Sequence, residues 1–154
     1  ARYDTAGLMD VERISKRWNT RPRYQNHVNN LGKLMLMARR LAERGAGFIT
    51  VTTDFVWDMH ADKNNATMTE GMQYVGRPFD HAVSAFIEDV HQRGLSEKIL
   101  LVVTGEMGRT PRINKNGGRD HYGNLTSLLV SGGGAEKRKE AGKGGGKSKN
   151  TAHN

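Results

Sequence analysis

The chain has 154 residues, of which 36% are hydrophobic and 6% aromatic, a composition that supports one hydrophobic core of modest size. It contains no cysteine, which excludes disulfide bonds and thiolate metal sites, so a metal ion would need His, Asp or Glu ligands. The formal net charge is +8, and residues 135–154 supply half of it, with six Lys or Arg residues against two Glu.

The first predicted elements are a helix and a strand, which follow an N-terminal extension at residues 1–29 to which we assign no element. Apolar residues recur at helical spacing from Val28 to Ala42, and Gly45 follows as a terminator, so this segment predicts an amphipathic helix. The β-branched, apolar run at 47–53 predicts a buried strand.

A second helix and two further strands complete the predicted domain. Pro78 marks the entry of the helix and Gly94 its exit, and the continuous apolar run at 98–104 is typical of a strand covered by helices on both faces. The run at 125–133 follows a long loop without a helical pattern, so we expect it to lie antiparallel to strand 98–104. The order helix, strand, helix, strand over residues 30–134 favours an α/β fold with a layered sheet.

The last segment, residues 135–154, is rich in Lys and Gly and has no apolar residue larger than Ala. Such a segment cannot bury enough surface to offset its ordering entropy, so we predict a disordered tail. Its charge would bind nucleic acid or another polyanion non-specifically, which is an alternative function for the chain. No apolar run approaches the roughly 20 residues that cross a bilayer, so we expect no membrane partner.

The segment at 104–124 is longer than most loops between strands and carries clustered acidic, basic and His residues. Its two ends and the residues after strand 47–53 would meet at one edge of the sheet, where open α/β sheets usually bind ligands. That edge predicts a metal site made of Asp58, His60, Glu106, Asp120 and His121.

Asp58 and His60 are two positions apart, so in extended backbone their side chains project to the same side and can reach one ion. The alternative is an Asp that bonds nearby backbone beside an exposed His. Either arrangement is compatible with the sequence at this point.

Glu106 directly follows strand 98–104, where a carboxylate would serve as a ligand or general base, or else as a helix N-cap or the ion-pair partner of Arg109. Asp120 and His121 are adjacent, so their side chains point apart. They would contact two neighbouring ions, or one would bind an ion directly while the other lies outside the ligand shell and interacts with the ligands. Alternatively, Asp120 pairs with an arginine on the surface.

Three arginines surround these candidates. Guanidinium groups suit tetrahedral oxyanions such as phosphate and sulfate, although arginines in a loop are often only solvated charge. The predicted oxyanion-binding residues are Arg109, Arg112 and Arg119.

Four phrases together resemble a bacterial family called the domain of unknown function 1501, namely "ARRLAERGAGFITV", "WDMH", "LLVVTGEMGRTPRINKNGGRDHYGN" and "LLVSGGG". The resemblance covers about residues 30–134, and members of this family look like sulfatase-like relatives of the alkaline phosphatase superfamily. It implies a partial alkaline-phosphatase-like α/β domain with one or two divalent ions, zinc or manganese, and a phosphate or sulfate ester as substrate. An exported or periplasmic location is implied by the resemblance alone.

By this resemblance, Asp58 and His60 match the first metal-binding element, Glu106 matches the acidic ligand after the strand, and His121 matches the later histidine ligand. The nucleophile of the superfamily follows an upstream strand, and residues 1–29 contain no apolar run with a suitable Ser or Thr after it. After residue 134 the family continues with further strands, whereas this chain continues with the Lys- and Gly-rich tail. We therefore expect the C-terminal portion of a hydrolase-like domain, in a truncated or frameshifted product that begins without Met, binds metal weakly and lacks turnover. A non-catalytic scaffold of the same fold is the remaining alternative.

Overall fold

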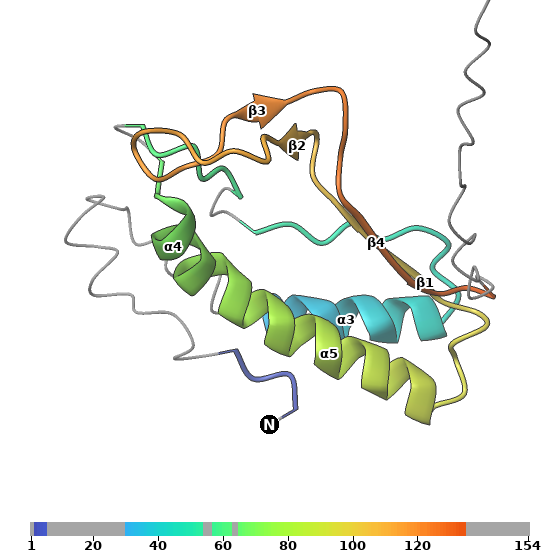
Figure 1. Ribbon diagram of the computed structural model, residues 1–154. Helices are drawn as coiled ribbons and strands as arrows, with labels where there is room; N and C mark the ends of the chain where they lie inside the picture. Colours follow the sequence, from blue (N-terminus) through green and yellow to red (C-terminus); the bar gives the residue numbers. More distant parts are fainter. Residues whose placement is uncertain (1, 6–29, 54–56, 63–64, 135–154) are drawn as a thin grey trace, which may run out of the picture.

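The computed structural model describes residues 2–5, 30–53, 57–62 and 65–134. The predicted tail disorder at 135–154 and most of the N-terminal extension lie outside these residues. In the described part the chain is a mixed α/β protein with two packed helices beneath a narrow, two-stranded arm (Figure 1). None of its helices combines the length and the apolar character that a bilayer span requires.

The two predicted helices are confirmed, and they pack against each other to form the core. Helix α3 spans Leu31–Glu43 and ends before Gly45, whose φ of 95° few other residues adopt. Helix α5 spans Arg77–Gln92 and lies beside α3 (Figure 1). The buried apolar residues between them are Leu31, Met35, Ala82, Val83, Phe86 and Val90.

The second helix begins earlier than Pro78. A short helix α4 (Met68–Gly71) and one π-helical turn η1 (Met72–Gly76) precede α5 in the same helical run. Thr67 caps α4: its hydroxyl accepts from the Glu70 amide at 3.3 Å, while the Glu70 carboxylate accepts from the Thr67 amide at 3.5 Å. This capping box stabilises the start of the run.

The strands pair as an antiparallel arm, which confirms the predicted orientation of the last strand. Strand β1 (Leu100–Thr104) pairs with β4 (Leu128–Gly132), with Val102 opposite Val130. Further out, β2 (Gly108–Arg109) pairs with β3 (His121–Tyr122), and the loop between β2 and β3 forms the tip of the arm above α4 (Figure 1).

Two predictions about the sheet are wrong for the described residues. The run at 47–53 is not a strand; the side chain of Phe48 is 90% exposed and that of Val51 packs on the core from irregular backbone. A strand needs a neighbour to complete its backbone hydrogen bonds, and β1 and β4 pair only with each other. Helices also cover only one face of β1, because Leu101 packs on the core whereas Leu100 and Val102 are half exposed. The larger layered sheet of the alkaline phosphatase type stays a prediction.

Candidate metal site

The segment that carries Asp58 and His60 is held against the helical run by its other side chains. Trp57 makes an edge-to-face contact with Phe79 of α5, with ring centroids 5.1 Å apart. Met59 is buried, and a Cβ on Gly71 of α4 would clash with its side chain, so α4 and this segment are in close contact. Because alternate residues of extended backbone face opposite sides, burial of Met59 turns Asp58 and His60 toward the arm.

The short β2–β3 ladder places the remaining residues of the site. Arg109 of β2 lies directly opposite His121 of β3. Gly108 allows the backbone at Leu125 to approach β2 closely, since a Cβ on Gly108 would lie 2.3 Å from the Leu125 carbonyl oxygen. The ladder thus presents an arginine and a histidine to Asp58 at the same point.

Asp58 is the centre of the resulting cluster. Its Oδ1 lies 2.6 Å from His60 Nδ1 and accepts from Arg109 Nη1 at 2.6 Å, while its Oδ2 lies 3.3 Å from His121 Nε2. The two imidazole rings meet edge to face with centroids 5.3 Å apart. Asp58, His60 and His121 each offer one ligand atom, and these atoms all lie within 4.8 Å of one another. This arrangement can hold a metal ion.

The contacts within the cluster lower the pKa of Asp58 and raise the pKa of His60. Burial acts to raise the pKa of Asp58, but hydrogen bonds from His60 and His121 and the charge of Arg109 outweigh burial and hold it below its usual value. The hydrogen bond to Asp58 raises the pKa of His60, against the smaller effect of burial, and Asp62 adds to the increase. Protons therefore compete with a metal ion for these ligands.

Glu106 and Asp120, the other two predicted ligands, lie apart from this cluster. The Glu106 side chain is 73% exposed, and its Oε1 lies 3.9 Å from Arg109 Nη2, which matches the ion-pair alternative. Asp120 is exposed and accepts a hydrogen bond at 2.9 Å from the side-chain amide of Asn114. Because Asp120 and His121 are neighbours in an extended segment, only His121 faces Asp58.

The three predicted oxyanion-binding arginines also differ in their surroundings. Arg109 lies in the cluster, and four-fifths of its side chain is buried. Arg119 donates to the carbonyl oxygens of Thr110 and Pro111, at 2.7 and 2.5 Å, so it organises the loop backbone. Arg112 is exposed. Arg109 is the one of the three that can contact both Asp58 and a bound anion.

Sequence reasoning overlooked residues that surround His60. Asp62 Oδ2 lies 3.2 Å from His60 Nε2, and the Asn65 side-chain amide lies 3.3 Å from the same nitrogen. The alternation of Asp58, His60 and Asp62 at every second position was a signal that could have found Asp62. Asn65 has no comparable signal in the sequence.

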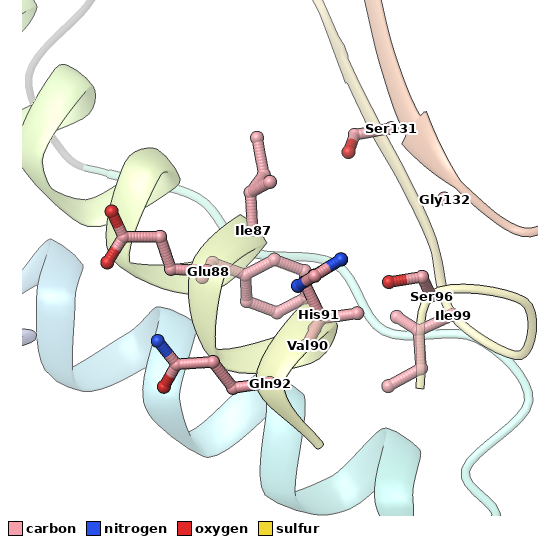
Figure 2. A pocket seen from close by; sticks show the side chains of 10 residues that line it. Ile87, Glu88, Val90, His91, Gln92, Ser96, Ile99, Ser131 and Gly132 are labelled. Atoms are coloured by element: carbon pink, nitrogen blue, oxygen red, sulfur yellow. The ribbon is translucent and has the colours of Figure 1, made fainter. Parts of the chain in front are cut away.

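A pocket of about 370 Å³ lies at the opposite end of the β1–β4 pair from the cluster. Side chains of α5, including Ile87 and His91, line one side, and Ser96, Ile99 and Ser131 line the other (Figure 2). Its lining is of mixed character, and no group of three His, Asp or Glu ligand atoms converges there among the described residues. The Asp58 cluster therefore remains the stronger candidate for a functional site.

The fold and the cluster define the class: a small mixed α/β protein with an Asp-His-His site beside a two-stranded arm. A family model described as "Protein of unknown function (DUF1501)" matches residues 5–154, so the chain belongs to the DUF1501 family. The match includes the N-terminal segment and the basic tail, which the resemblance at 30–134 left out. No curated protein matches the chain, and no solved structure does.

Proposed function

We propose that the chain is part of a metal-dependent, hydrolase-like domain for phosphate or sulfate esters, in which Asp58, His60 and His121 hold a divalent ion. The observation that carries this proposal is the convergence of the three ligand atoms within 4.8 Å. Asp58 and His121 are 63 positions apart in the sequence, so their approach depends on tertiary structure. The resemblance over residues 30–134 supports the ester substrate class.

The donor set fits a zinc or manganese ion. Two imidazoles and one carboxylate are ligands that both ions accept, and three protein ligands leave coordination positions open for a substrate. Asp58 has a second oxygen, Oδ2, that faces His121 rather than Arg109. Metal binding at that oxygen is compatible with the Arg109 contact, because the guanidinium occupies Oδ1.

Arg109 is placed to bind an anionic substrate. Its guanidinium has Asp58 on one side and the exposed Glu106 on the other, and a divalent ion would take over part of the charge of Asp58. The arginine would then be available to an ester oxyanion next to the ion. Such a site supplies Lewis-acid polarisation of the phosphoryl or sulfuryl oxygen. We assign no nucleophile, and we expect binding without turnover.

The test is metal binding measured by native mass spectrometry and by titration calorimetry with zinc and with manganese. We expect one bound ion per chain, and its loss in the double variant Asp58→Asn, His121→Ala. The matched control is Asp80→Asn, His81→Ala, which makes the same chemical changes at exposed positions of α5 and should bind like the wild type.

A wild-type chain without a specific ion, or a control variant as defective as the site variant, would contradict the metal site. Inorganic phosphate should bind the metal-loaded wild type about tenfold more tightly than Arg109→Gln, since a charge-assisted hydrogen bond contributes about 1.5–3 kcal/mol. Arg112→Gln is the control for that comparison. Rapid ester hydrolysis by the pure chain would contradict the expectation of binding without turnover.

Polyanion binding by the tail and a non-catalytic scaffold stay predictions. The tail lies outside the described residues, so its charge is the sole support for the first. Stability that is unchanged by chelation would favour the scaffold.

A further inference from the structure

Asn114, in the loop between β2 and β3, connects the two segments that carry the candidate ligands. Its side-chain Nδ2 donates to the carbonyl oxygen of His60 and to Asp120 Oδ1, both at 2.9 Å. The first acceptor belongs to one candidate ligand, and the second belongs to the residue before His121. One amide group therefore bridges the His60 and His121 segments.

The carbonyl side of the same amide holds its own loop. Asn114 Oδ1 accepts from the backbone amides of Asn116 and Gly118 at 3.0 Å. The backbone amide of Asn114 donates to the Gly118 carbonyl oxygen at 2.8 Å. An asparagine offers two donor hydrogens and two acceptor positions, and here all four are used. No other residue type of this length provides that combination.

Gly118 brings the two backbones into contact. It is buried, and a Cβ there would lie 2.3 Å from the carbonyl carbon of His60, closer than any side chain allows. Next to it, the Arg119 amide donates to the Met59 carbonyl at 3.0 Å. We call Asn114 and Gly118, with these contacts, the 114–118 clasp.

We propose that Asn114 is a positioning residue: through the 114–118 clasp it holds His60 and His121 in the relative geometry that a metal ion requires, without contacting the ion. The inference rests on the proposed function for its metal readout. The direct contact of His121 with Asp58 is a weak restraint, because half of the His121 side chain is exposed and its nitrogen lies 3.3 Å from Asp58. The 114–118 clasp is less exposed, and it fixes the position of His121 relative to His60 before an ion binds. Residues that hydrogen-bond to metal ligands commonly have this role.

The test compares Asn114→Asp with Asn116→Asp in the full chain. Asn114→Asp keeps the acceptor oxygens but removes both donors and places a carboxylate against Asp120. Asn116→Asp makes the same charge change on an exposed side chain of the same loop. We expect Asn114→Asp to lower zinc affinity by about tenfold or more, the range for partners of metal ligands, and Asn116→Asp to retain it.

A second readout needs no metal. In the metal-free wild type, the edge-to-face rings of His60 and His121 should give a nuclear Overhauser effect between their ring protons. This signal should weaken in Asn114→Asp and persist in Asn116→Asp. The double variant Asn114→Asp, Asp120→Asn supplies a donor from the other side and should recover part of the signal and part of the affinity.

An Asn114→Asp protein that keeps both the ring contact and zinc affinity within about twofold of wild type would overturn the inference. If the wild type binds no zinc, the proposed metal site fails, whereas the ring contact still decides whether the clasp positions the histidines. If Asn114→Asp does not fold, Asn114→Ser, which adds no charge, is measured by the same two readouts and decides in its place.

Discussion

Asp58 shows how the surroundings of one side chain set its chemistry. Its Oδ1 is shared by His60 and Arg109 and its Oδ2 faces His121, so one carboxylate is surrounded by three nitrogen groups. Each of these groups stabilises the ionised form, and together they outweigh burial and lower the pKa of Asp58. The hydrogen bond with Asp58 raises the pKa of His60 above its ordinary value of 6.5, and Asp62 adds to the increase.

The raised pKa of His60 predicts a pH dependence for the metal-free protein. Because the folded pKa exceeds the unfolded one, the folded state binds more protons between the two values. The contribution of His60 to the free energy of unfolding is therefore fully present below the unfolded pKa, and it is lost as the pH rises through the folded pKa. Zinc affinity should rise over the same window, because the ion needs neutral imidazole.

Urea unfolding of wild type and His60→Gln, from about pH 5 to about pH 9, checks this expectation. The difference in unfolding free energy between the two should shrink as the pH rises. His81→Gln, which makes the same change at an exposed position of α5, is the control for the substitution itself. A His60→Gln difference that does not vary with pH would show that the histidine gains nothing from Asp58.

The elements that position the cluster include one that the predicted helix boundaries omitted. Helix α4 carries Gly71, against which Met59 packs, and the Met68 amide at its start donates to the Gly117 carbonyl of the loop at 2.9 Å. The signal for α4 was present as Thr67 and Glu70, a Ser/Thr-x-x-Glu spacing, but the apolar periodicity is clear only from Phe79 onward. A short capped helix is easily overlooked when periodicity is the main criterion.

Substitution of Thr67 tests the role of this cap. Thr67→Ala removes the acceptor for the Glu70 amide and should lower the free energy of unfolding by about 1 kcal/mol. Thr69→Ala, an exposed threonine within α4, should be neutral or slightly stabilising, because alanine has the higher helix propensity. Urea unfolding of the two variants gives the comparison, and equal effects would exclude a specific capping contribution.

In the molecule as a whole, Asp89 of α5 connects its own helix to two segments that are distant in the sequence. It accepts from Tyr3 at 3.0 Å, from Arg39 of α3 at 2.8 Å and from Arg93 at 2.8 Å. Arg39 is buried and also pairs with Glu43. Burial, with the hydrogen bond to Asp89, raises the pKa of Tyr3 to about 12.

Asp89→Asn should therefore destabilise the protein strongly. The variant removes the charge of one of the two carboxylates that pair with the buried Arg39, and breaking a buried ion pair costs about 3–5 kcal/mol. Asp80→Asn, at an exposed position of the same helix, should change stability by less than about 0.5 kcal/mol. Thermal unfolding followed by circular dichroism measures both, and similar melting temperatures for the two variants would contradict the importance of the network.

Elements of the fold that depend on a local pattern could be predicted from the sequence, whereas those that depend on a neighbouring segment could not. Helix α3, helix α5 and strand β1 could be predicted because each is a contiguous segment with a clear apolar pattern. The run at 47–53 has the composition of a strand, but a strand also depends on a neighbour that the segment itself does not specify. Likewise, the one-sided burial of β1 depends on what packs against it.

For the candidate site, local spacing predicted that Asp58 and His60 face the same side, since that relation depends only on extended backbone. The sequence also placed His121 and Arg109 in the loop that approaches them. Tertiary structure alone decided that Glu106 and Asp120 lie apart from the cluster, and that Asn114 joins its two halves. These outcomes depend on the β2–β3 register and on the contact of Gly118 with His60, which are relations between distant segments and leave no periodic signal in either one.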